Sequence, residues 1–266
     1  MGSIRDILGQ TLPAEKLRNF SGRFDVIGDI AVVTIPPGFE GDEEVIGQAI
    51  RKHRPGICTV IKKVSRISGS YRTATYEVIL GSGTETTHRE NGFSYDLDLQ
   101  SSFFTSRLAH ERKRVTGQVR AGESVLVLFA GVGPFVIPSA SRGARVVAVE
   151  QNPDACRWLV RNLLKNRVAE RVTVIPEDAF DPALLPDESF DRVIIPAPYG
   201  RDESFDLAAT KVRDKGILHF YTFKNAKQSK EWEQEFEKKG YELIFRHRCG
   251  NVAPAVSRWV FDLRQR

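Results

Sequence analysis

Cysteine is scarce in this chain. The 266 residues include three cysteines, Cys58, Cys156 and Cys249, which are isolated and odd in number. The sequence contains no C-x-x-C pair and no Cys/His cluster, and this argues against a structural zinc site and against a disulfide framework. We therefore expect no metal, and a reducing, cytoplasmic setting.

Long apolar runs and an excess of acidic residues are also lacking. No stretch approaches the roughly 20 apolar residues of a membrane helix, and the charged residues 1–16 do not have the apolar core of a secretory signal. We expect no association with membranes. The 39 basic residues outnumber the 34 acidic ones, which gives a net charge of +5 and an isoelectric point of about 9.1. A polyanionic partner and an ordinary basic surface explain this excess equally well.

The pattern of apolar residues changes near residue 100. Residues 1–100 are predicted to form a small α+β domain, with a strand–turn–strand over 24–33 and a helix over 43–53. Three β-rich runs follow, at 58–64, 73–80 and 93–99.

Residues 101–266 begin with a helix at about 106–119 and then alternate short apolar strands with helices. Such alternation indicates βαβ units and a mainly parallel sheet. The predicted strands are 125–129, 145–149, 172–175, 192–195 and 216–221, and the predicted helices are 134–142, 153–167, 203–213 and 226–239. The expected fold class is α/β: a Rossmann-like domain preceded by the smaller α+β domain.

Small or acidic residues follow three consecutive strands of the predicted sheet. The first strand runs into Phe129–Phe135, FAGVGPF, where small residues let a ligand approach the backbone. The second strand ends in Glu150, whose carboxylate can accept hydrogen bonds from two ribose hydroxyls. Asp178 follows the third strand and can hold an adenine amino group. Taken separately, Glu150 could be a solvated strand-end acid and Asp178 a helix N-cap.

A nicotinamide cofactor is the rival reading of this glycine turn. It calls for the third glycine of the G-x-G-x-x-G motif. The frame that starts at Gly131 runs Gly-Val-Gly-Pro-Phe-Val, so Val136 occupies that third position. This departure disfavours a nicotinamide enzyme.

Three motifs carry a resemblance to a known family. FAGVGPF at 129–135, VVAVEQNPDA at 146–155 and GILHFYTF at 216–223 resemble the archaeal and eukaryotic tRNA guanine-37 N1-methyltransferases. The wybutosine-synthesis aminocarboxypropyl transferases are the sister family. The resemblance extends over nearly the whole chain, through segments 28–30, 88–92, 104–112, 253–254 and 261–263.

The resemblance implies a class I methyltransferase domain with S-adenosylmethionine as its cofactor. It places Gly131 and Gly133 beside the methionine part, Glu150 at the ribose and Asp178 at the adenine. The remaining residues expected at the cofactor are Phe129, Ala130, Pro196 and Pro198.

The resemblance also implies a catalytic set. Guanine N1 carries a proton at neutral pH, so a base must remove it, and negative charge then develops on O6. By motif position the base is Glu111, the cation at O6 is Arg72, and Arg107 lies one helical turn before Glu111. The plainer reading of Arg107 and Glu111 is an exposed ion pair worth about 0.3–0.5 kcal/mol. The target base must leave its stack, which suits the anticodon stem-loop of a tRNA as partner.

This chain departs from the family pattern at three points. Pro196 stands where the family has an Asn that helps to position the guanine, Val127 replaces an Asp, and the chain begins directly with the inner domain. These departures motivate a second hypothesis, a methyltransferase that modifies a protein side chain such as histidine or cysteine. Aminocarboxypropyl transfer and a non-enzymatic RNA-binding module are further alternatives. Arg107-Leu108 favours methyl transfer, because the sister family has a small residue and Asn there.

Overall fold

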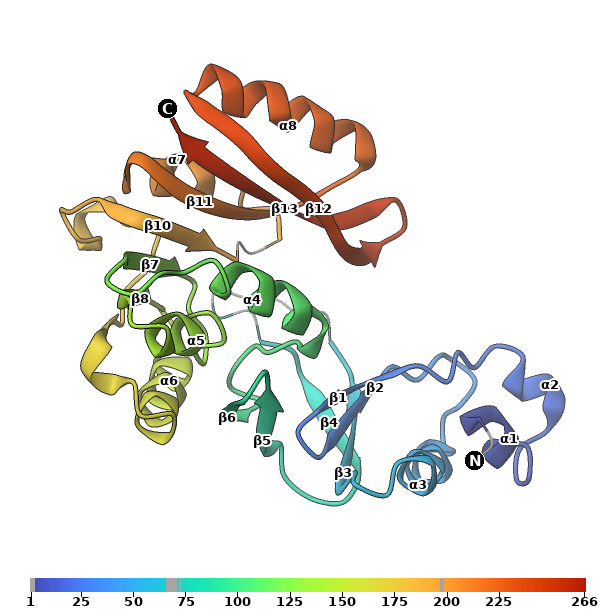
Figure 1. Cartoon of the computed structure of the whole chain (residues 1–266). Coiled ribbons are helices and arrows are strands. Elements are labelled where there is room, and N and C mark those ends of the chain that lie inside the picture. The colour runs from blue at the N-terminus through green and yellow to red at the C-terminus, as the bar shows by residue number, and fades with distance from the viewer. Residues whose placement is uncertain (1–2, 66–70, 72, 197–198) are drawn as a thin grey trace. The chain divides into compact units, whose positions relative to one another are not determined.

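The computed structural model describes residues 3–65, 71, 73–196 and 199–266. The chain separates into two compact units, residues 1–106 and 107–266 (Figure 1), whereas the sequence places the join between residues 100 and 101. Two predicted site residues, Arg72 and Pro198, lie outside the described residues.

The N-terminal unit is built on a four-stranded sheet of order β1-β2-β3-β4. Strands β2 and β3 are parallel because α3 crosses between them, and the outer pairs are antiparallel. The predicted strand–turn–strand and helix are confirmed, whereas the sequence does not predict β5, which pairs with β6 in a separate sheet. The elements are α1 (Ile4–Leu8), α2 (Ala14–Leu17), β1 (Phe24–Ile27), β2 (Ile30–Val33), α3 (Glu43–His53), β3 (Thr59–Lys63), β4 (Tyr76–Leu80), β5 (Glu85–Glu90) and β6 (Phe93–Asp98).

The turn between β1 and β2 explains one of the sequence motifs. Gly28 has a left-handed φ of 59°, and a Cβ there would lie 2.0 Å from Thr86 Oγ1. Its N–H donates to Nδ1 of His88 at 3.1 Å, and Thr86 Oγ1 donates to Asp29 Oδ1 at 2.6 Å. Glycine is therefore required because the turn is fastened tightly to β5.

The C-terminal unit is built on a seven-stranded sheet of order β12-β13-β11-β10-β7-β8-β9. The five strands from β11 to β9 are parallel, and β13 lies antiparallel between β11 and β12. This arrangement confirms the predicted Rossmann-like α/β fold. The strands are β7 (Ser124–Leu128), β8 (Arg145–Val149), β9 (Val172–Ile175), β10 (Phe190–Ile195), β11 (Val212–Lys224), β12 (Tyr241–Ala253) and β13 (Val256–Gln265).

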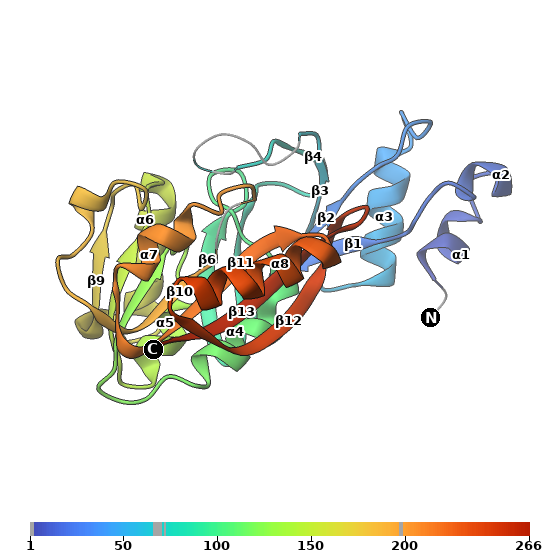
Figure 2. The ribbon, with the colours of Figure 1, turned by 90° about the horizontal axis from the view of Figure 1, so that it is seen from above.

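Helices cover both faces of this sheet, as the continuous apolar strands require. Within this unit, α4, α5 and α6 lie on one side and α7 and α8 on the other (Figure 1). Helix α8 runs along β11, β12 and β13 (Figure 2). The helices are α4 (Ala109–Thr116), α5 (Val136–Ser141), α6 (Pro153–Lys165), α7 (Ser204–Ala209) and α8 (Ala226–Lys238). None of the helices in the described part of the chain has the length and apolar character of a membrane span.

The order of the strands locates the site. Strand β7 lies between β8, the next strand in the chain, and β10, the third strand after β7. The chain therefore adds strands on both sides of β7. In such sheets ligands bind outside the carboxyl ends of the strands at this switch point. The residues that follow β7, β8, β9 and β10 therefore come to the same edge of the sheet.

Candidate active site

The glycine turn after β7 is fastened to the neighbouring strand. Phe129, Gly131 and Gly133 all have positive φ angles, of 54°, 54° and 97°. The N–H of Ala130 donates to the carbonyl of Val149 at 3.0 Å. This hydrogen bond holds the turn against the end of β8.

Glu150 is held by backbone groups on both of its oxygens. The N–H of Gly131 donates to Oε2 at 2.8 Å, and the N–H of Asn152 donates to Oε1 at 2.9 Å. Burial raises the pKa of Glu150, although these N–H groups act in the opposite direction. Each carboxylate oxygen has a further lone pair, so the residue fits a ligand that presents two hydroxyls, as a ribose does.

Asp178 is exposed and serves its own turn, because its Oδ1 accepts the N–H of Phe180 at 3.0 Å. The Phe180 ring packs against Phe129, with centroids 5.2 Å apart, and the guanidinium of Arg201 lies 3.6 Å from the Phe180 centroid. The geometry brings Phe129, Gly131, Glu150 and the turn after β9 to one edge. Asp178 is not the helix N-cap considered as its alternative role, because the N-cap of the following 3-10 helix, Pro182–Leu184, is Asp181.

Residues after β10 complete this edge. Pro196 directly follows the strand and offers no side-chain hydrogen bond. Tyr199 is 54% exposed, and its ring lies 5.1 Å from that of Phe223 in β11. Arg258 lies on β13, and its guanidinium is 5.0 Å from the centroid of the Phe223 ring. Tyr199, three residues after Pro196 in the chain, is therefore part of an aromatic pair with a cation at its side.

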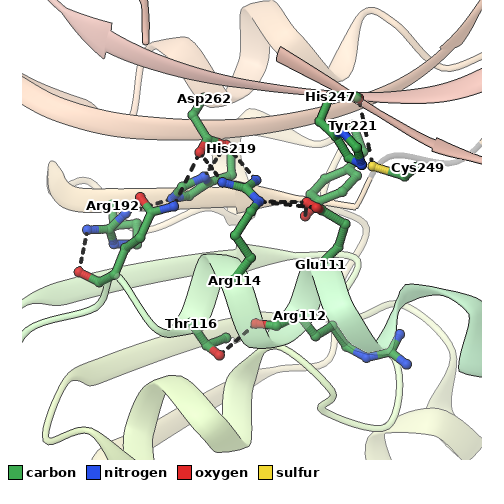
Figure 3. Close-up of polar contacts among 11 residues, drawn as sticks. Glu111, Arg112, Arg114, Thr116, Arg192, His219, Tyr221, His247, Cys249 and Asp262 are labelled. Carbon is green, nitrogen blue, oxygen red and sulfur yellow. Dashed lines mark hydrogen bonds and ion pairs between the residues drawn. The ribbon is translucent and has the colours of Figure 1, made fainter. Parts of the chain in front are cut away.

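Glu111 lies on α4 and is buried, with 4% of its surface exposed. Nε of Arg114 donates to Oε1 at 3.2 Å and to Oε2 at 3.0 Å, and the hydroxyl of Tyr221 donates to Oε2 at 3.4 Å (Figure 3). The reading of Glu111 as part of an exposed ion pair is wrong, because the helix turns this residue toward the sheet. Arg107 is exposed, in the 3-10 turn Ser106–Leu108 before α4.

The groups around Glu111 keep their protons. Burial, together with the charge of Glu111, raises the pKa of the Tyr221 hydroxyl well above its ordinary value. The same two causes raise the pKa of the Cys249 thiol to about 12. Glu111 is thus the group of this trio that is suited to accept a proton.

Nothing in the sequence assigns Arg114, Tyr221 or Cys249 to this site. Tyr221 belongs to a motif noted above, but nothing local in the sequence says that β11 brings it to α4. The described residues include no group of three or more potential metal ligands.

A doubly wound sheet with an inserted antiparallel strand, a glycine turn and an acidic strand end at its switch point defines a class I methyltransferase fold. The chain belongs to the TRM5/TYW2 methyltransferase family. The family model described as the TRM5/TYW2 methyltransferase domain matches residues 86–244, and that described as the TYW2 N-terminal domain matches residues 4–84. The resemblance read from the sequence is confirmed.

Two relatives illustrate the two sides of this family. A tRNA (guanine(37)-N(1))-methyltransferase, Trm5b of Pyrococcus abyssi, is 36% identical over 222 residues, which cover 83% of this chain and 65% of that protein. A crystal structure of Trm5b from the same organism gives a TM-score of 0.88 at 34% identity and covers 99% of this chain and 80% of that one.

The second relative is a tRNA(Phe) (4-demethylwyosine(37)-C(7)) aminocarboxypropyltransferase of Pyrococcus horikoshii. It is 31% identical over 277 aligned positions, which cover 98% of this chain and 95% of that protein. A structure of P. horikoshii TYW2 in complex with MeSAdo gives a TM-score of 0.78 at 28% identity and covers 98% and 97% of the two chains. This chain therefore spans nearly all of one relative and 65% of the other.

Proposed function

We propose that this protein transfers the methyl group of S-adenosylmethionine to N1 of guanine 37 in tRNA, with Glu111 as the general base. The observation that carries the proposal is the setting of Glu111, a buried carboxylate between two groups that hold their protons. Both relatives described above are named for position 37 of tRNA, which supports the anticodon stem-loop as the partner.

The cofactor is assigned to the edge of the sheet after β7, β8 and β9. Glu150 binds the ribose hydroxyls, Asp178 takes the adenine, and Gly131 and Gly133 lie beside the methionine part. The analogue-bound relative supports an adenosyl ligand in this fold. When bound, S-adenosylmethionine supplies an electrophilic methyl group. The other residues assigned to this site are Phe129, Ala130, Pro196 and Pro198.

The residues of the chain manage the proton and the charge. Glu111 takes the proton from N1, so the electron pair of the N–H bond becomes available to form the new bond to carbon. The family resemblance assigns to Arg72 the stabilisation of the negative charge that moves onto O6, and it assigns to the catalytic set Arg107, which lies in the 3-10 turn before α4. Tyr199 serves as the aromatic wall for the unstacked base, because its ring is exposed and supported by Phe223.

A second candidate, aminocarboxypropyl transfer, is favoured by two observations. Residues 4–84 match the TYW2 N-terminal domain, and the aminocarboxypropyltransferase aligns over 95% of its length. The same cofactor would supply a different group. Arg107-Leu108 favours methyl transfer, and the mass of the product separates the two reactions.

The test is transfer of labelled methyl from S-adenosylmethionine to an unmodified tRNA transcript by the purified protein. We expect 1-methylguanosine in the digested RNA, its absence when guanine 37 is changed to adenine, and its loss in Glu111→Gln. Glu170→Gln is the matched control, because Glu170 is an exposed acid outside the site. A product that carries an aminocarboxypropyl group, or label that enters only protein in a cell extract, would overturn the proposal.

A further inference from the structure

Two motifs noted in the sequence, at 216–223 and 261–263, each contain a buried polar residue that has no role in the proposed reaction, His219 and Asp262. The structure joins them to α4. His219 on β11 and Asp262 on β13 are directly opposite each other in the sheet, and His219 Nδ1 lies 2.7 Å from Asp262 Oδ1. Asp262 in turn accepts hydrogen bonds from both Nη groups of Arg114, at 2.5 and 3.1 Å (Figure 3). A single chain of contacts therefore connects the sheet with Glu111.

The chain of contacts continues away from Glu111. Nη1 of Arg192 on β10 lies 2.6 Å from Nε2 of His219, and Nε of Arg192 donates to Glu123 Oε2 at 2.9 Å. Arg192, His219 and Asp262 are 5%, 0% and 3% exposed. Buried charges are tolerated when each has an opposite partner and a hydrogen bond. The charged groups between Glu111 and Glu123 alternate in sign, with His219 between Asp262 and Arg192.

The contacts fix the protonation state of His219. Arginine can only donate, so Nε2 of His219 accepts from Arg192 and the ring proton lies on Nδ1, from which it is donated to Asp262. Burial and the positive charge of Arg192 lower the pKa of His219, although Asp262 raises it. His219 is thus a neutral donor that holds one oxygen of Asp262 in place.

Asp262 controls which face of Arg114 reaches Glu111. The two Nη groups of Arg114 are bound to Asp262, and Nε–H is shared between the two oxygens of Glu111. We propose that Asp262, held by His219, is a positioning residue that keeps the paired Nη groups of Arg114 away from Glu111. This inference rests on the proposed function of Glu111.

The chemical reason concerns the basicity of Glu111. A two-pronged pair between arginine and a carboxylate is the strongest that these groups make, and it stabilises the ionised form. If Arg114 turned both Nη groups onto Glu111, that carboxylate would become a weaker base. By occupying the Nη groups, Asp262 prevents this pairing and leaves Nε–H as the group of Arg114 that binds Glu111.

The pH dependence of Glu111 also depends on the other groups that face it. The carboxylate is approached by residues of four elements. These are Arg114 from α4, Tyr221 from β11, Cys249 from β12, whose thiol also feels the charge of Arg258, and Asp262 from β13, which acts through Arg114. Tyr221 and Cys249 stay neutral over the working range, because the pKa of each is raised. The charged groups whose effect on Glu111 can be tested by substitution are therefore Arg114 and Asp262.

Two substitutions should move the acid limb of the pH–rate profile in opposite directions. Asp262→Asn releases Arg114 to pair fully with Glu111, so we expect the midpoint to fall by about one pH unit and the limiting rate by about tenfold. In Arg114→Lys the ammonium stays with Asp262, because lysine lacks the fork that bridges two carboxylates. Glu111 then loses its partner in a buried place, and the midpoint should rise.

The measurement is single-turnover methyl transfer to the tRNA transcript across pH, using the full chain. Asp191→Asn is the matched control, because Asp191 pairs with Arg213 and Ser124 at the far end of β10. We expect its profile to match that of the wild type. Circular dichroism confirms that each variant is folded, and Arg114→Lys carries the test by itself if Asp262→Asn does not fold.

The outcomes separate the two proposals. A wild type that transfers nothing to tRNA overturns the proposed function, and this inference with it. An active wild type whose folded variants keep its pH midpoint overturns this inference alone. In that case the contacts of Asp262 serve only to join α4 to the sheet.

Discussion

The carboxylate of Glu150 accepts the backbone N–H of Gly131 at 2.8 Å. This bond joins the end of β8 to the glycine turn after β7, so the two parts of the proposed cofactor site are positioned together. A carboxylate can accept from the Gly131 and Asn152 backbone N–H groups and from ribose hydroxyls at the same time, because it carries two acceptor oxygens.

Glu150→Gln should weaken binding of S-adenosylmethionine by about 10- to 100-fold. The amide turns one of the two acceptors into a donor that faces a backbone N–H, and a hydrogen bond to a charged group contributes about 1.5–3 kcal/mol. Isothermal titration calorimetry measures the change, with Glu170→Gln as control. An unchanged dissociation constant would remove Glu150 from the cofactor site.

Gly133→Ala should destabilise the C-terminal unit by about 1–3 kcal/mol. A Cβ at this position would lie 2.6 Å from Leu159 Cδ1 and 3.1 Å from Ile137 Cδ1, and the φ angle of 97° adds strain. Gly122→Ala is the matched control, because Gly122 has a φ of 83° with nothing within 4 Å of a Cβ. Urea unfolding of both variants isolates the clash, and equal losses would show that packing against α6 does not require this glycine.

Stability should fall as the pH drops below about 6.5, the ordinary pKa of histidine. The pKa of His219 is lowered in the folded protein, so the unfolded chain binds a proton that the folded chain does not. The full contribution is present above that pH and is lost on acidification, with a slope of up to about 1.4 kcal/mol per pH unit. His219→Gln should flatten the slope below about pH 6.5, because glutamine does not titrate.

Unfolding by urea at several pH values tests the role of His219. His110 is exposed on α4, so His110→Gln is the control and should keep the wild-type slope. A His219→Gln protein with the wild-type slope would assign the acid sensitivity to other groups.

Tyr199→Ala should raise the KM for the tRNA transcript about tenfold, whereas Tyr199→Phe should leave it within about twofold. Stacking of a base on an aromatic side chain contributes about 1–3 kcal/mol, and phenylalanine keeps the ring that packs against Phe223. Steady-state kinetics on the transcript distinguishes the two variants. If Tyr199→Phe loses as much as Tyr199→Ala, the hydroxyl replaces the missing Asn and the aromatic wall is not the explanation.

Local signals made the Rossmann-like unit predictable. The strands β7 to β10 are short apolar runs between helical stretches, and Phe129–Phe135 and Glu150 stand directly at strand ends, where the chain order itself places them at one edge. The long β12 and β13 strands were not predicted. Strand β12 has mostly exposed residues and many charges, so it lacks the alternating apolar pattern by which strands are recognised.

The sequence by itself determined the family, the parallel sheet and the residues at the strand ends, because each depends on motifs or on periodicity within a few residues. Tertiary structure alone decided that Tyr221 reaches Glu111 and which groups bind Arg114, its partner on the same helix. The residues connected through Arg114, which are Asp262, His219 and Arg192, come from three strands, and the pairing of β11 with β13 sets His219 opposite Asp262. The register between distant strands is fixed by the packing of the whole unit. No local sequence pattern therefore predicts the contacts that this register creates.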